Sequence, residues 1–142
     1  MDINWNKFNE LTSELSKQII ADNYKPDYIV AVARGGWIPT RFLSDFLGVK
    51  KIESVGIGYK DIGRTELELY SYPKHIRKNE KVIVVEDMLE SGRSLVEVVK
   101  QFTSRGVIVK TAAIFYKTHS ILIPDYNVSL NDDMVKFPWE TN

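Results

Sequence analysis

The stretch Lys81–Leu95 constrains the fold more than any other part of this sequence. It opens with the β-branched run Val82 to Val85, which is too short for a helix and suits a strand buried on both faces, as in a parallel sheet. Two acids follow at once, and then a short loop of small and hydroxylic residues. Apolar residues from Leu95 to Phe102 then recur at helical spacing. The pattern predicts a strand, a polar loop and a helix N-terminus in direct succession.

This junction is suited to a phosphorylated sugar. The first free amides of a helix point outward and the helix dipole is positive there, so Ser91, Gly92 and Ser94 could surround a phosphate. Glu86 and Asp87 would lie too close to that phosphate to bind it directly. Their expected partners are sugar hydroxyls, or a hard cation reached through those hydroxyls or water. From the residues alone, an ordinary turn with a serine N-cap and two solvated acids fits about equally well.

The order of these residues resembles the motif that binds phosphoribosyl pyrophosphate (PRPP) in type I phosphoribosyltransferases. The shared pattern is an apolar run, Glu-Asp, two apolar residues, an acid and Ser-Gly-x-Ser, where the family usually has Thr at the two Ser positions. It is not a Walker A pattern, because no Gly-Lys-Ser/Thr follows. The resemblance implies that Glu86 and Asp87 hold the ribose hydroxyls and the linked Mg²⁺, and that Glu90 is the catalytic group near purine N7. It assigns the 5-phosphate to Ser91, Gly92, Arg93 and Ser94.

A second buried strand is predicted at Tyr28–Ala33, followed directly by Arg34-Gly35-Gly36. Glycines between strand and helix let a ligand approach the backbone, and Arg34 adds a forked cation, but a tight turn has the same composition. In the family, a loop of this kind ends the first strand of the sheet and binds pyrophosphate. There the peptide between the basic residue and glycine is often cis. The resemblance therefore assigns Arg34 and Gly35 to pyrophosphate and raises the expectation of a cis Arg34–Gly35 bond.

Two helices are predicted in the first third of the chain. Aromatic and aliphatic residues recur at three- and four-residue steps from Trp5 to Ile19, with Asn4 as N-cap and an end near Asn23. We assign this apolar stripe to core packing. The second helix is bracketed by Pro39 and Gly48.

Residues 52–59 and 65–72 are two extended stretches joined by a polar connection that contains Gly63. From composition alone, this is an ordinary solvated hairpin. The resemblance implies a mobile lid, at about residues 57–72, that closes over PRPP. It also implies that Tyr59, Lys60 and Arg64 contact the pyrophosphate.

The last part of the chain resembles the base-binding region of purine enzymes. A strand predicted at 107–116 ends at Lys117, which matches the lysine that donates to purine O6 in 6-oxopurine phosphoribosyltransferases. Pro-Asp-Tyr at 124–126 and Pro-Trp at 138–139 resemble the C-terminal hood of the hypoxanthine, guanine and xanthine enzymes. Met134 stands where the family usually stacks an aromatic side chain on the purine, and a thioether can also lie against a π face. The resemblance implies a hood at about 117–142 with the purine-binding residues Lys117, Met134, Val135 and Glu140.

Composition sets further limits. A chain of 142 residues suits a single domain spanning residues 1–142. Lys plus Arg equals Asp plus Glu, at 19 each, so there is no overall basic field to attract nucleic acid or an anionic membrane. Cysteine is absent, which excludes disulfides and thiolate chemistry and fits a cytoplasmic location. No apolar stretch is long enough to span a bilayer, and the N-terminus does not resemble a signal peptide.

These expectations combine into one hypothesis. The fold is α/β, the type I phosphoribosyltransferase fold, with a mostly parallel central sheet flanked by helices, a lid hairpin and a small hood. The resemblance implies a Mg²⁺-dependent transfer of the phosphoribosyl group from PRPP to N9 of a 6-oxopurine in a dimer or tetramer, with Mg²⁺ carried by PRPP and no direct metal site. Neither His75 nor His119 is placed for metal binding. The alternatives are a PRPP-sensing regulatory protein that binds DNA or RNA, and a transferase for adenine, uracil or orotate.

Overall fold

The strands of this protein form one sheet in the computed structural model, which describes residues 1–141. Within that range the sheet is six-stranded, in the order β3-β2-β1-β4-β5-β6. All neighbouring strands are parallel except β2 and β3, which form an antiparallel hairpin. The prediction of a mostly parallel α/β sheet is confirmed. The strands are β1 (Tyr28–Ala33), β2 (Ile52–Tyr59), β3 (Leu67–Ser71), β4 (Lys81–Leu89), β5 (Ile108–Tyr116) and β6 (Tyr126–Leu130).

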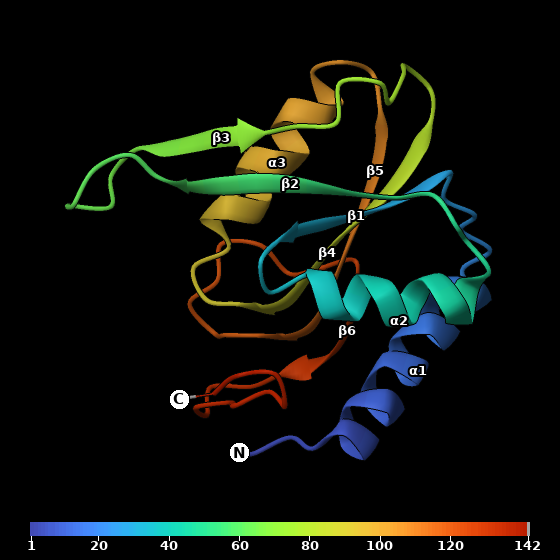
Figure 1. Ribbon diagram of the computed structural model, residues 1–142, viewed down its shortest axis with the longest axis vertical. Helices are drawn as coiled ribbons and strands as arrows, with labels where there is room; N and C mark the ends of the chain where they lie inside the picture. Colours follow the sequence, from blue (N-terminus) through green and yellow to red (C-terminus); the bar gives the residue numbers. More distant parts are fainter. Residues whose placement is uncertain (142) are drawn as a thin grey trace.

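Helices cover both faces of the sheet. Figure 1 shows α1 (Trp5–Ala21) and α2 (Trp37–Leu47) on one face and α3 (Arg93–Thr103) on the other. The predicted N-cap is confirmed, because Asn4 Oδ1 accepts a hydrogen bond of 2.8 Å from the Lys7 amide. Gly48 ends α2 in the left-handed conformation, at φ 66°.

Strand β4 lies at the centre of the sheet and supplies both halves of the core. Val82 and Val84 pack toward α3, and Ile83 and Val85 pack toward α1 and α2; all four are fully buried. Successive side chains of a strand point to opposite faces, so a strand covered on both sides needs an unbroken apolar run. Each such side chain contributes about 1.5–3 kcal/mol through burial. This explains why this segment carries the strongest signal in the sequence.

The parallel arrangement places the polar loops together. The carboxyl ends of β1, β4 and β5 lie at one edge of the sheet, so the loops that follow residues 33, 89 and 116 meet there. Crevices at the carboxyl ends of parallel strands are the usual ligand sites of open α/β sheets. The fold therefore brings the candidate residues to a common edge.

Three local features differ from expectation. The strand that was predicted at residues 82–85 continues through the acid pair to Leu89. A sixth strand, β6, pairs with β5 where no strand was predicted. The prediction of a cis Arg34–Gly35 bond is wrong by one peptide, since the cis bond joins Ala33 and Arg34.

The N-terminal segment anchors the C-terminal tail. Asp2 forms a parallel bridge with Lys136, and the Ile3 amide donates to the Lys136 carbonyl at 2.9 Å. Phe137 is buried, and Trp139 packs edge-on against Phe8 of α1, with ring centroids 4.9 Å apart. The tail is thus held against α1 by both backbone and aromatic contacts. Within residues 1–141, no helix combines the length and apolar character needed to cross a membrane.

Candidate functional site

A small cavity lies at the N-terminus of α3, and we call it the α3 pocket. It has a volume of about 150 Å³. Gly92 is the N-cap of α3 at φ 78° and has no side chain to cap the helix; the Arg93 amide donates to Ser91 Oγ at 3.3 Å, and the first amides of a helix are suited to an anion. The lining residues are Tyr59, Arg64, Glu86, Met88, Glu90, Ser91, Gly92, Ser94 and Leu95.

Close packing requires the glycine at position 92. A Cβ atom there would lie 2.6 Å from Ser120 Oγ and 3.2 Å from the Leu122 amide nitrogen. The chain that follows β5 also bonds directly to the loop before α3, because the Ile121 amide donates to the Ser91 carbonyl at 2.8 Å. The loop before α3 therefore depends on the chain that follows β5, as well as on its own turn.

Glu86 and Asp87 are adjacent on β4 and so point to opposite sides of the strand. Glu86 lines the α3 pocket, and Asp87 lines a second cavity. Burial and the neighbouring Asp87 charge raise the pKa of Glu86 to about 8. Burial and the Glu140 charge raise the pKa of Asp87 to about 6, although the Met88 amide, which donates to Asp87 Oδ1 at 2.7 Å, counters part of this. Two carboxyls with little compensating charge suit hydroxyl donors or a cation.

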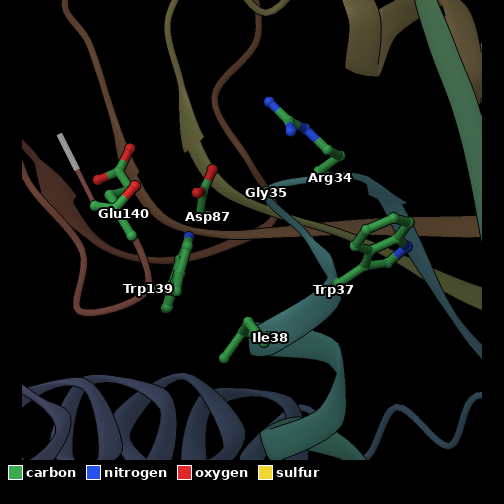
Figure 2. Close-up of a pocket in the computed structure, with 8 residues that line it drawn as sticks. Arg34, Gly35, Trp37, Ile38, Asp87, Trp139 and Glu140 are labelled. Carbon is green, nitrogen blue, oxygen red and sulfur yellow. The ribbon is translucent and has the colours of Figure 1, made fainter.

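The second cavity, which we call the Arg34 cavity, has a volume of about 510 Å³. Figure 2 shows Asp87 and Glu140 side by side in it, with Trp139 below them and the Arg34 guanidinium extending from the opposite side. Gly35 packs directly on the acid, since a Cβ atom at this position would lie 2.5 Å from Asp87 Oδ1. The cavity is lined by Arg34, Gly35, Trp37, Ile38, Asp87, Trp139, Glu140 and Thr141. A cavity lined by one guanidinium and two carboxyls can hold an anion and a cation at the same time.

The predicted lid residues separate in the structure. Tyr59 and Arg64 reach the α3 pocket, and the Arg64 Cζ atom lies 4.9 Å from the centre of the Tyr59 ring. Lys60 lies in a different groove, together with Glu68 and Glu97. None of the three lines the Arg34 cavity. The structure therefore brings Tyr59 and Arg64 to the α3 pocket and leaves Lys60 apart.

The predicted purine-binding residues also separate. Lys117 Nζ donates to the backbone carbonyls of Asp132 and Asp133, at 3.3 and 2.9 Å. Met134 follows these residues and is 86% exposed, whereas Val135 is partly buried against the core. Glu140 is not with this group, because it lies beside Asp87 in the Arg34 cavity.

The family model described as the phosphoribosyl transferase domain matches residues 4–142. This chain belongs to the phosphoribosyl transferase domain family. The resemblance found in the sequence, and the type I phosphoribosyltransferase fold, are thereby confirmed.

Several proteins similar to this phosphoribosyltransferase have names that refer to purine bases. The xanthine-guanine phosphoribosyltransferase of Idiomarina loihiensis is 25% identical over 97% of this chain and 85% of its own length. The purine phosphoribosyltransferase of Pyrococcus horikoshii superposes with a TM-score of 0.88 at 27% identity, covering 99% of this chain and 93% of that one. The xanthine-guanine-hypoxanthine phosphoribosyltransferase of Helicobacter pylori gives a TM-score of 0.89 at 26% identity, with the same coverage.

Sequence reasoning missed several residues that surround the Arg34 cavity. Trp37, Ile38, Trp139 and Thr141 line the Arg34 cavity but were not among the predicted site residues. The Pro-Trp pair that marked the tail could have identified Trp139. No comparable signal singled out Trp37 or Ile38, which read as the first turn of a helix. Among residues 1–141, no group of three or more His, Cys, Asp and Glu side chains could hold a metal ion.

Proposed function

We propose that this phosphoribosyltransferase transfers the 5-phosphoribosyl group of PRPP to N9 of a 6-oxopurine, producing a nucleoside 5′-monophosphate and pyrophosphate. One observation carries the proposal. The α3 pocket and the Arg34 cavity lie on the two sides of the Glu86-Asp87 pair, so a phosphate site and an anion-plus-cation site flank one acidic edge. A ribose with phosphates at both ends needs such an arrangement. The purine names of the relatives support the choice of base.

The α3 pocket is the proposed 5-phosphate site. The hydroxyls of Ser91 and Ser94 and the backbone amides at the start of α3 can donate to a phosphate, and the helix dipole favours its charge. Arg64 adds a cation on the same pocket. The ribose would then extend along the acid pair toward the Arg34 cavity, where Arg34 and the Gly35 backbone would meet pyrophosphate.

Mg²⁺ fits the acidic side of the Arg34 cavity. Burial raises the pKa of Asp87, and the Glu140 charge raises it further, so a bound cation would stabilise the charged form of Asp87. Mg²⁺ prefers carboxylate, phosphate and water oxygens, so Asp87 and Glu140 are the residues suited to meet the ion carried by PRPP. The ion would supply charge stabilisation for the leaving pyrophosphate.

The protein's own residues would provide the remaining chemistry. As the bond from C1 to pyrophosphate lengthens, the sugar gains oxocarbenium character, and Arg34 can stabilise the charge that develops on the leaving group. Glu90 is exposed at the mouth of the α3 pocket, where its carboxylate can take up or hold the proton of the base. Lys117 and the backbone near Val135 would meet the base from the hood.

We further propose that residues 1–142 form one domain with a lid at about 57–72 and a hood at about 117–142. The hairpin contact with the α3 pocket and the Lys117 bonds to the hood backbone support those boundaries. We also propose that the protein is cytoplasmic and forms a homo-oligomer, either a dimer or a tetramer. Trp37 on α2 is 51% exposed, and a large exposed aromatic side chain is suited to contacts between subunits. Light scattering measures the assembly.

The test is a panel of bases incubated with PRPP and Mg²⁺, with pyrophosphate release as the readout and mass spectrometry of the nucleotide formed. The proposal expects turnover with hypoxanthine, guanine or xanthine and little with adenine, uracil or orotate. A Ser94→Ala variant should lose affinity for PRPP, whereas Ser104→Ala, a serine at the far end of α3, should not. PRPP binding without turnover of any base would instead favour a PRPP-sensing protein.

A further inference from the structure

Arg93 lies in the middle of the predicted phosphate loop, yet its side chain contacts the β2–β3 hairpin. Its Nη1 donates to the Arg64 carbonyl at 3.3 Å, and its Nη2 donates to the Thr65 carbonyl at 3.1 Å. Its Cζ atom lies 5.4 Å from the centre of the Tyr59 ring. The guanidinium thus joins the start of α3 to the end of the hairpin, and it does not line the α3 pocket.

The chemistry of this contact is specific to arginine. Two successive carbonyls accept from the two arms of one planar guanidinium, which a lysine ammonium on a flexible stem does not reproduce. Bonds from a cation to carbonyls are also stronger than bonds between neutral groups.

The hairpin turn is held together by its own hydrogen bonds. Asp61 Oδ1 accepts from the Thr65 and Glu66 amides, at 2.9 Å each, and the Lys60 amide donates to the Glu66 carbonyl at 2.8 Å. Because these bonds are local to the turn, they persist whether or not the turn touches α3. The contact with Arg93 therefore determines where the whole turn lies.

Two guanidinium groups meet on one aromatic ring. Arg64 and Arg93 both lie against Tyr59, with Cζ atoms 4.9 and 5.4 Å from its centre. Two cations that share one ring repel each other, on whichever faces they lie, and an anion between the hairpin and α3 would relieve that repulsion. Occupation of the α3 pocket by a phosphate should therefore strengthen the contact between hairpin and loop.

We propose that Arg93 is a positioning residue that holds the β2–β3 hairpin over the α3 pocket, so that Tyr59 and Arg64 face a bound 5-phosphate. This assigns Arg93 to the hairpin instead of to the phosphate. The identity of the anion rests on the proposed function, but the contact itself does not.

Trypsin provides a direct test on the unliganded chain. Trypsin cleaves the peptide bond after Arg64, and the carbonyl of that bond accepts from Arg93. Loss of the hydrogen bond from Arg93 should therefore expose this peptide bond to the protease. Arg93→Ala should increase the rate of cleavage after Arg64 by about tenfold, the size expected for two hydrogen bonds at an exposed site. Arg93→Lys should retain part of the protection. Arg77→Ala is the matched control, because Arg77 pairs with Glu80 at 3.7 Å and should leave the rate unchanged.

Kinetics give a second readout that a general loss of stability would not produce. Arg93→Ala should raise the KM for PRPP by about tenfold and leave the KM for the purine unchanged, with partial rescue by Arg93→Lys. PRPP with Mg²⁺ should slow cleavage after Arg64 in the original chain and much less in Arg93→Ala.

Equal cleavage rates after Arg64 in Arg93→Ala and Arg77→Ala would overturn the proposal. If Arg93→Ala does not fold, as judged by circular dichroism, the same comparison with Arg93→Lys decides. Faster cleavage in a chain that transfers no phosphoribosyl group would support the role of Arg93 and refute only the proposed function.

Discussion

Replacing Gly92 with alanine tests whether the loop before α3 is a rigid, preformed anion site. Gly92 has φ 78°, which L-residues avoid, and its missing Cβ is the space occupied by the chain after β5. Ser120 Oγ cannot simply turn away, because it donates to the Leu122 carbonyl at 2.7 Å. Alanine must therefore adopt a strained conformation and also displace a bonded loop.

The expected cost follows from these two effects. A left-handed conformation costs a non-glycine residue about 1–2 kcal/mol. Inserting a methyl group into a packed region costs about 1–3 kcal/mol more. Gly92→Ala should then lower the free energy of unfolding by about 2 to 5 kcal/mol.

Gly48→Ala is the matched control. Gly48 has nearly the same conformation, at φ 66°, but nothing lies within 4 Å of the position that its Cβ would occupy. It should lose only the conformational part, about 1–2 kcal/mol. The difference between the two variants therefore measures the close packing at Gly92 alone.

Thermal unfolding with and without PRPP and Mg²⁺ is the assay. For a chain of this size, each kcal/mol corresponds to about 3 °C in Tm. Ligand at a hundredfold excess over Kd adds about 2.7 kcal/mol, which Gly48→Ala should retain and Gly92→Ala should lose. Equal Tm values and equal ligand shifts in the two variants would show that the reasoning about the loop is wrong.

Three further predictions concern the acids and Lys117. Glu90→Gln should lower turnover by about 10²- to 10⁴-fold with little change in the Kd for PRPP, and unchanged turnover would remove Glu90 from proton transfer. Because the pKa of Glu86 is raised from 4.5 to about 8, the folded chain holds a proton that the unfolded chain releases. The bound proton therefore stabilises the folded chain fully below about pH 4.5, and this contribution is lost as the pH rises to about 8. Glu86→Gln should flatten the pH dependence of the free energy of unfolding, measured with urea, across that range. Lys117→Ala should reduce turnover of hypoxanthine selectively, and equal losses for hypoxanthine and adenine would contradict its assignment to the 6-oxo group.

Much of the fold could be predicted because its signals are local. The run from Val82 to Val85 needs no knowledge of its neighbours to be recognised as a strand buried on both faces. The same holds for the apolar stripe of α1 and for Asn4 as its cap, since helical spacing and capping act within a few residues. Strand β6 was missed because Tyr126–Leu130 is short, and its extended conformation depends on pairing with β5.

The sequence by itself determined which side chains could gather at the carboxyl edge of the sheet, because a motif such as Glu-Asp followed by Ser-Gly-x-Ser is read along the chain. Only the tertiary structure decided their partners. It put Glu140 beside Asp87, turned Lys60 away from the α3 pocket and joined Arg93 to the hairpin. It also raised the pKa of Glu86, through burial. Contacts between distant segments and the loss of water around a carboxyl depend on how elements pack, and local spacing carries no record of either.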